Sequence, residues 1–266
     1  MSDGTEFNEE RIAALERIYR TPSMSDRRRR VRDLLALESG EEVLSVGTGP
    51  GFESHGLAAD VGEEGRVHGI DTAPPMLAVA RDRCADLDWA TFEEGDAAEL
   101  PIGAATFDAA TAVQVYEYVA DLDAAVSELY RVLRPGGRAI VLSSDARTMT
   151  YHAADQARSD RITAAFANHY TNPQLARTVK PRLEGANFEV TDQEAYVHFE
   201  TELCDDAVSA AFIPGIKSVV TERGAIDERE VEAWVDDLHA RGDAGEYFFS
   251  YNQYLYVAEK PRMEAG

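Results

Sequence analysis

The sequence predicts an α/β fold, and two patterns support that prediction. Residues 43–46 form a short apolar run, residues 47–51 carry three alternating glycines, and residues 52–61 follow with helical spacing. This is the order of a buried strand that turns through glycines into a helix. Residues 107–113 are nearly continuous in small and apolar residues, which is typical of a strand covered by helices on both faces.

The other segments can be assigned in chain order. Helical spacing covers residues 9–19, 25–37, 52–61, 74–83, 122–133 and 172–183. Strand-like runs cover residues 43–46, 67–70, 89–92, 107–113, 138–142, 188–199 and 247–258. Thr21-Pro22 is expected to end the first helix, residues 144–158 are polar, and residues 202–241 are largely helical. Residues 1–5 are expected to form a loose tail.

The glycine segment predicts a binding site for a small ligand with an anionic end. Glycine lets a ligand approach the backbone, and the start of the following helix presents free N–H groups. Asp71 comes 20 positions after Gly51, at the end of the next strand, where a carboxylate can accept both hydroxyls of a ribose. Asp96 follows a third strand-like run, in a position that suits an adenine amino group. An adenosine-type cofactor is therefore expected.

These motifs resemble those of class I S-adenosylmethionine-dependent methyltransferases, including the small-molecule type 11 group. The likeness covers roughly residues 25 to 145, through the order of Gly47-Thr48-Gly49-Pro50-Gly51, Asp71, Asp96, Phe107-Asp108 and Leu133-Arg134-Pro135-Gly136-Gly137. The resemblance implies a Rossmann-like sheet of seven strands, parallel except for one antiparallel strand near the end, with helices on both faces. It also implies S-adenosyl-L-methionine as the cofactor. The family usually has an acid where this chain has Ser45, which leaves open how the methionine ammonium is held.

The resemblance divides the chain into three parts and names its cofactor-binding residues. Residues 1–24 are the tail and first helix, 25–145 the cofactor-binding core, and 146–266 the rest of the sheet, with a helical substrate lid at about 202–241. The expected cofactor contacts are Gly47, Thr48, Gly49, Gly51, Asp71, Thr72, Met76, Asp96, Ala97 and Gln114. Tyr19 either closes the cofactor pocket or packs in the core.

Methyl transfer from a sulfonium is an in-line displacement, so proximity and alignment supply most of the catalysis. Tyr116 is expected beside the sulfonium, and a proton acceptor is sought among His152, His198, Tyr116 and Glu117. His152 ranks first because it follows the fifth strand on the acceptor side. A surface or structural role is the alternative for each histidine.

The acceptor is expected to be a small molecule with an apolar body, because aromatic residues are dense in the last third of the chain. Ordinary strand packing explains most of these aromatics. The segment from Arg131 to Gly137 is shared with quinone-pathway methyltransferases, but Ser143-Ser144 stand where those enzymes usually carry an acid. Arsenite methylation is disfavoured because the two cysteines, Cys84 and Cys204, do not cluster. Metal-ligand spacing is absent, so no metal site is predicted.

The chain is strongly acidic, with 49 Asp and Glu against 26 Lys and Arg and a formal net charge of −23. This excess disfavours nucleic acid as a partner and is typical of a halophilic protein that is soluble when salt screens it. The run Arg27 to Arg30 is interpreted as a solvated helix face paired with acids. The polar N-terminus and the lack of a long apolar run predict a cytoplasmic protein without signal peptide or membrane span.

Two other functions remain open at this stage. One is a nicotinamide-dependent oxidoreductase that uses the same loop and ribose acid, although the glycine spacing and Asp96 argue against it. The other is a protein that binds S-adenosylmethionine without turnover. The oligomeric state is not predicted.

Overall fold

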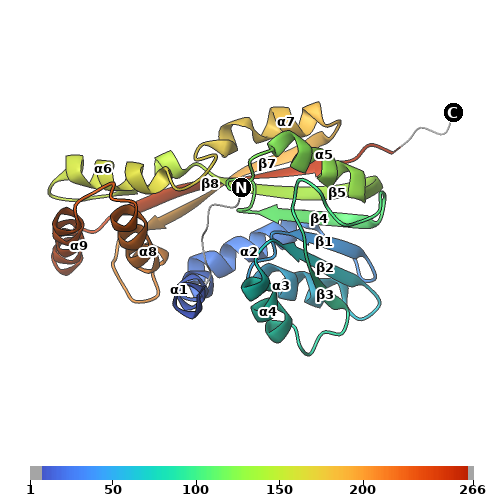
Figure 1. Ribbon diagram of the computed structural model, residues 1–266, viewed down its shortest axis with the longest axis horizontal. Coiled ribbons are helices and arrows are strands. Elements are labelled where there is room, and N and C mark those ends of the chain that lie inside the picture. The colour runs from blue at the N-terminus through green and yellow to red at the C-terminus, as the bar shows by residue number, and fades with distance from the viewer. Residues whose placement is uncertain (1–7, 263–266) are drawn as a thin grey trace.

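A single sheet runs through the length of the molecule, with helices on both sides (Figure 1). The computed structural model describes residues 8–262, so the predicted tail at residues 1–5 lies outside it. The helices are α1 (Glu9–Arg20), α2 (Pro22–Leu35), α3 (Phe52–Val61), α4 (Pro74–Arg83), α5 (Leu122–Val132), α6 (Gln156–Ala167), α7 (Val179–Gly185), α8 (Val208–Glu222) and α9 (Glu228–Asp243), with short 3-10 turns at Ala146–Thr148 and Leu175–Thr178.

The sheet has the order β3-β2-β1-β4-β5-β8-β6, and β7 pairs with β8. Strand β8 is antiparallel to β5, β6 and β7, whereas β1 to β5 pair in parallel. The strands are β1 (Glu42–Val46), β2 (Arg66–Asp71), β3 (Ala90–Glu94), β4 (Phe107–Val113), β5 (Leu133–Ser144), β6 (Thr150–Tyr151), β7 (Glu189–Glu200) and β8 (Phe249–Glu259).

The seven predicted strands and the single antiparallel strand among them are confirmed, and the structure adds two elements. The short strand β6 and the helix α6 both fall in the stretch that the sequence marked only as polar or did not assign. Strand β5 begins earlier than predicted, at Leu133, because the Pro-Gly-Gly segment forms an irregularity within the strand. Gly136 has a φ of 85°, and the register shifts opposite β4 between Phe107 and Ala109. Helix α2 also begins earlier, since Pro22 is well suited to the first helical position.

Two apolar cores cover the two faces of the sheet. On one face, α5 and α7 bury residues such as Leu129 and Leu183 against β4 and β5. On the other, α2 and α3 bury Val31, Leu35 and Leu57 against β1, β5 and β8. Because parallel strands covered on both faces end at one edge, the turns after β1, β2 and β4 meet there.

Strand β8 and its neighbours extend past the end of β5 and carry a third core. Helices α6, α8 and α9 pack around that extension (Figure 1). Trp234, Tyr151 and Phe249 are fully buried in this core. Helix α2 contributes Met24 to the same core. Helix α2 and strand β8 thus connect the parallel part of the sheet, β1 to β5, with the helical end of the molecule, which is formed by α6, α8 and α9.

The interpretation of the four consecutive arginines as a solvated face is wrong for two of them. Arg27 is 1% exposed and Arg28 is 9% exposed, whereas Arg29 and Arg30 pair with Asp26 and Glu194. A helix turns 100° per residue, so four consecutive positions cannot all face water when one side of α2 lies on the sheet.

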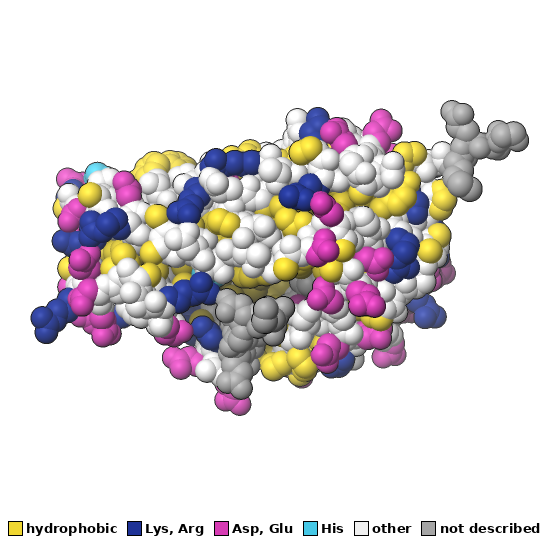
Figure 2. Space-filling model, turned by 45° about the horizontal axis from the view of Figure 1, so that its top comes forward, with side chains coloured by type: hydrophobic (Ala, Val, Ile, Leu, Met, Phe, Trp, Pro, Cys, Tyr) yellow, Lys and Arg dark blue, Asp and Glu magenta, His cyan; other side chains and the backbone are white. Residues whose placement is uncertain are grey.

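Acidic and basic side chains are interspersed over the face shown in Figure 2. Among residues 8–262, no helix is both long and apolar enough to span a bilayer.

Candidate functional site

The loop between β1 and α3 is shaped by glycines with left-handed backbone. Gly47, Gly49 and Gly51 have φ of 63°, 52° and 80°. A Cβ on Gly51 would lie 2.8 Å from Ala80 Cα, so that glycine allows α3 and α4 to approach each other. A Cβ on Gly49 would meet nothing within 4 Å, so its backbone faces open space. The loop therefore offers bare backbone at the point where α3 begins.

Asp71 lies against this loop, as the sequence predicted for a ribose acid. Its Oδ2 accepts a hydrogen bond from the Gly49 N–H at 2.8 Å, and its Oδ1 accepts one from the Ala73 N–H at 2.9 Å. Burial raises the pKa of this carboxyl, against the lowering effect of the backbone donors. A carboxylate has about four lone-pair sites, so these backbone donors leave acceptor capacity for a ligand.

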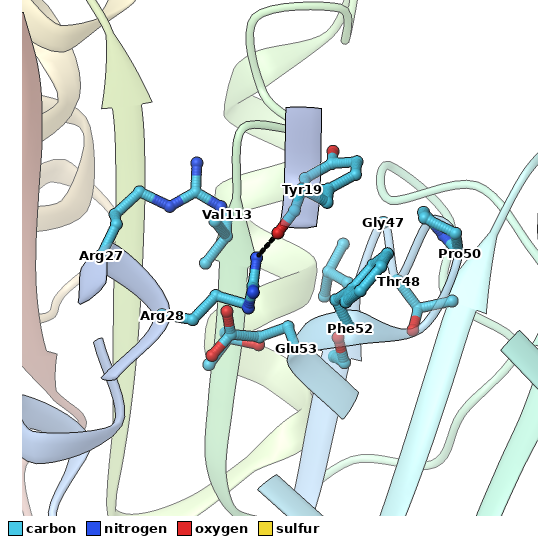
Figure 3. Close-up of a pocket in the computed structure, with 12 residues that line it drawn as sticks. Tyr19, Arg27, Arg28, Gly47, Thr48, Pro50, Phe52, Glu53 and Val113 are labelled. Carbon is cyan, nitrogen blue, oxygen red and sulfur yellow. Dashed lines mark hydrogen bonds between the residues drawn. The ribbon is translucent and has the colours of Figure 1, made fainter. Parts of the chain in front are cut away.

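A small cavity opens beside the loop, between β1, β4 and the two N-terminal helices (Figure 3). Tyr19 lines this cavity and stacks on Phe52, with 5.6 Å between the ring centroids. Of the two positions predicted for Tyr19, the structure thus shows the one at the cavity. The cavity is lined by Tyr19, Arg27, Arg28, Ser45, Val46, Gly47, Thr48, Pro50, Phe52, Glu53, Thr111 and Val113.

The cavity walls carry charges of both signs. Glu53, in the first turn of α3, is 9% exposed, and neither of its carboxylate oxygens has a hydrogen-bond partner among the described residues. Burial raises the pKa of Glu53 to about 7, although Arg27, Arg32 and Arg28 all act to lower it. Arg28 donates to the Tyr19 carbonyl oxygen at 2.8 Å and to Ser25 Oγ at 3.0 Å.

The chain leaves β4 through a strained residue that faces the same region. Gln114 has a φ of 56°, a conformation uncommon for a residue with a Cβ, and its amide oxygen accepts from Arg27. Three positions on, Glu117 is 1% exposed. Its Oε1 accepts from the Ser144 N–H at 2.7 Å, while its Oε2 has no partner within the part of the chain that the structure describes. Burial raises the pKa of Glu117 to about 7.

The other predicted cofactor residues lie around the ends of β2 and β3. Thr72 and Met76 follow Asp71 into α4, with Thr72 exposed and Met76 buried. Asp96 is exposed, and its Oδ1 accepts from the Ala98 N–H at 2.8 Å, while Ala97 is buried beside it. Their contact with an adenine stays a prediction.

The structure separates the predicted catalytic residues. Tyr116 is 2% exposed and its hydroxyl donates to the Ala125 carbonyl oxygen within the core under α5. The His152 side chain is exposed beyond β6, and the backbone N–H of His152 donates to the Phe248 carbonyl oxygen. Neither residue lines the cavity.

His198 is fully buried and bonded on both ring nitrogens, to Ser23 Oγ at 2.6 Å and to Gln253 Oε1 at 3.1 Å. Burial lowers the pKa of its imidazole to about 4, so the ring is neutral near pH 7.

Sequence reasoning missed Glu53, Arg27 and Arg28 as site residues. Glu53 lies two residues after the last loop glycine, which is a usable signal for a first-turn carboxylate at a ligand site. The burial of Arg27 and Arg28 could not be read from the sequence, because they belong to a run of four consecutive arginines. No group of three or more His, Cys, Asp or Glu residues within 8–262 is placed to hold a metal ion.

The glycine loop, Asp71 and the cavity lie together at the carboxyl edge of a mostly parallel sheet, which is where open α/β sheets bind their ligands. A sequence model described as a methyltransferase domain matches residues 44–141. These residues are thus similar to methyltransferase domains, which bind S-adenosylmethionine in the class I family that the sequence motifs resemble.

Curated relatives resemble different shares of the chain. An uncharacterised 37.1 kDa protein in a transposon of Streptomyces fradiae is 29% identical over 93% of this chain and 71% of its own length. The arsenite methyltransferase of Halobacterium salinarum is 31% identical over 59% of this chain and 39% of its own length. The demethylmenaquinone methyltransferase of Thermus thermophilus is 40% identical over 43% of this chain and 52% of its own length. The chain thus spans about half, or less, of these two methyltransferases.

Solved structures share the fold. The phosphoethanolamine N-methyltransferase 2 of Haemonchus contortus, solved with S-adenosyl-L-methionine, has a TM-score of 0.64 at 19% identity over 98% of this chain and 59% of its own. The [4+2]-cyclase SpnF has a TM-score of 0.59 at 23% identity, over 90% of this chain and 81% of its own. At these identities the likeness concerns the fold alone.

Proposed function

We propose that this chain transfers a methyl group from S-adenosyl-L-methionine to a small, partly apolar molecule. The observation that supports this most strongly is the Asp71 carboxylate held 2.8 Å from the Gly49 N–H, beside a cavity, within the segment that matches the methyltransferase domain. The relatives named arsenite and demethylmenaquinone methyltransferase favour the same class of reaction. The cofactor supplies a methyl group already activated as a sulfonium.

The residues present fit this cofactor. Asp71 has free lone pairs for the ribose hydroxyls, and Asp96 lies where the adenine amino group is expected. The first turn of α3 has no side-chain cap, so its N–H groups and positive end are available to the methionine carboxylate. The Gln114 carbonyl follows β4 directly and is assigned to the sulfonium side, because a carbonyl oxygen stabilises a nearby positive charge.

We assign the acceptor to the space between the end of β4 and the helical end of the molecule. Glu117 supports this placement, because it is a buried carboxylate with one oxygen unpartnered and a pKa of about 7. A carboxylate with that pKa can take a proton near neutral pH when the attacking atom needs to lose one. Helices α6, α8 and α9 are assigned as the cover of this space. His152 and Tyr116 remain candidate catalytic residues only if a conformational change during turnover brings them to the acceptor.

Calorimetric titration with S-adenosylhomocysteine and with NADH tests the cofactor assignment. We expect S-adenosylhomocysteine to bind and NADH not to bind; the reverse would establish the oxidoreductase alternative. Incubation with methyl-deuterated S-adenosylmethionine and a cell extract, read by mass spectrometry, then tests turnover. Binding without any labelled small molecule would favour a protein that binds the cofactor without methylating.

The acidic composition supports a cellular setting as well. With a net charge of −23, the chain repels itself at low salt, so a salt-rich cytoplasm is the proposed location. The same charge opposes binding to nucleic acid phosphates.

A further inference from the structure

Glu53 is the least satisfied charged group at the site. Its side chain is buried in the first turn of α3, lines the cavity, and has both oxygens without a partner among residues 8–262. A buried carboxylate in that state costs stability, since it has lost water without gaining hydrogen bonds. Native structures leave few such groups, and a perturbed carboxylate that lines a cavity is a candidate for ligand binding.

The nearby arginines do not satisfy it. Arg27 donates to Gln114, and Arg28 donates to the Tyr19 carbonyl and Ser25. Arg32 pairs with Asp60, with Nε and Oδ2 2.8 Å apart. Each arginine therefore has another partner, and Glu53 faces the cavity without one (Figure 3).

The cavity matches an α-amino acid group in charge. Its lining includes the Glu53 carboxylate and the guanidinium groups of Arg27 and Arg28. A zwitterion can place its ammonium toward the first and its carboxylate toward the second. Ser45 also lines the cavity, but its hydroxyl brings no charge.

We propose that Glu53 binds the ammonium group of the methionyl end of the cofactor, supplying the charge that Ser45 lacks. The assignment rests on the proposed use of S-adenosylmethionine and identifies the residue that holds its amino acid end. An ammonium would give both orphaned oxygens a charge-assisted donor, the strong class of hydrogen bond. Arg28 then faces the methionyl carboxylate at the start of α3.

The test compares two nucleosides that differ in the group concerned. S-adenosylhomocysteine carries the ammonium, whereas 5′-methylthioadenosine has the same adenosine and a sulfur without it. For Glu53→Gln, calorimetry should show a dissociation constant at least about tenfold higher for S-adenosylhomocysteine and within twofold of wild type for 5′-methylthioadenosine. Glu64→Gln, an exposed glutamate just beyond α3, controls for the loss of one negative charge and should change neither constant.

A double variant tests whether a carboxylate at position 45 can replace the one at Glu53. Adding Ser45→Asp to Glu53→Gln returns a carboxylate to the cavity and should recover part of the S-adenosylhomocysteine affinity. Binding of 5′-methylthioadenosine reports, for each variant, that the site is folded.

Three results would overturn the proposal. Unchanged S-adenosylhomocysteine affinity in Glu53→Gln would show that the ammonium is held elsewhere. Equal weakening of both nucleosides would show that Glu53 only shapes the loop. A wild-type chain that binds neither nucleoside would remove the cofactor assignment itself, and this inference with it.

Discussion

Replacing Glu53 by Gln should stabilise the ligand-free protein, and the gain should grow with pH. Burial raises the pKa of Glu53 to about 7 from an ordinary 4.5. Between these values the folded protein holds a proton that the unfolded chain has released, so stability falls as pH rises and levels off above pH 7. The charged groups that act on Glu53 are Arg27, Arg28 and Arg32 on α2, which lower its pKa, and Asp60 on α3, which raises it.

The size of the effect follows from the shift. A difference of about 2.5 pKa units corresponds to roughly 3 kcal/mol when Glu53 is fully ionised, at 1.36 kcal/mol per unit. Less than about 1 kcal/mol of that is present at pH 5, where the folded group is still protonated. The gap in unfolding free energy between Glu53→Gln and wild type should therefore widen by about 2 kcal/mol from pH 5 to pH 8. Any fixed cost of burying the amide cancels in this difference.

Urea unfolding at constant KCl, followed by tryptophan fluorescence and circular dichroism, measures the gap at each pH. Glu117, with a shift of the same sign, is present in both proteins and cancels. Glu64→Gln should show a gap that does not vary with pH. A gap that stays constant for Glu53→Gln, or narrows toward pH 8, would show that Glu53 is already ionised and compensated in the folded protein.

Three further outcomes are expected. Glu117→Gln should lower kcat by about 100-fold for an acceptor that must lose a proton, with the S-adenosylhomocysteine Kd unchanged; slower turnover in His152→Ala instead would move the base there. Asp71→Ala should raise that Kd by about 30-fold or more through lost ribose hydrogen bonds, while the exposed Asp88→Ala should not, and equal Kd values would displace the ribose site. The Tm should rise with KCl as salt screens the net charge of −23; a Tm independent of KCl would refute the halophilic assignment.

Local patterns in the sequence determined most of the sheet. The helices beginning at Phe52 and Pro74, and the strand from Phe107 to Val113, lie within the predicted bounds, because apolar periodicity and glycines act over a few residues. The position of Asp71 was likewise predictable, since the ends of adjacent parallel strands meet at one edge. Helix α6 was not assigned, because the face that it buries in the helical end is only weakly apolar and does not stand out in the sequence.

The distribution of charges around the loop is visible only in the packed fold. Arg27 and Arg28 are indistinguishable from Arg29 and Arg30 in sequence, and the side of α2 that lies on the sheet makes the first two buried. Glu53 could not be singled out for the same reason, because whether a buried carboxylate has a partner depends on where all its neighbours lie in space. Local sequence therefore predicted where the bare backbone of the glycine loop lies, whereas packing between distant segments sets which side chains line the cavity beside it.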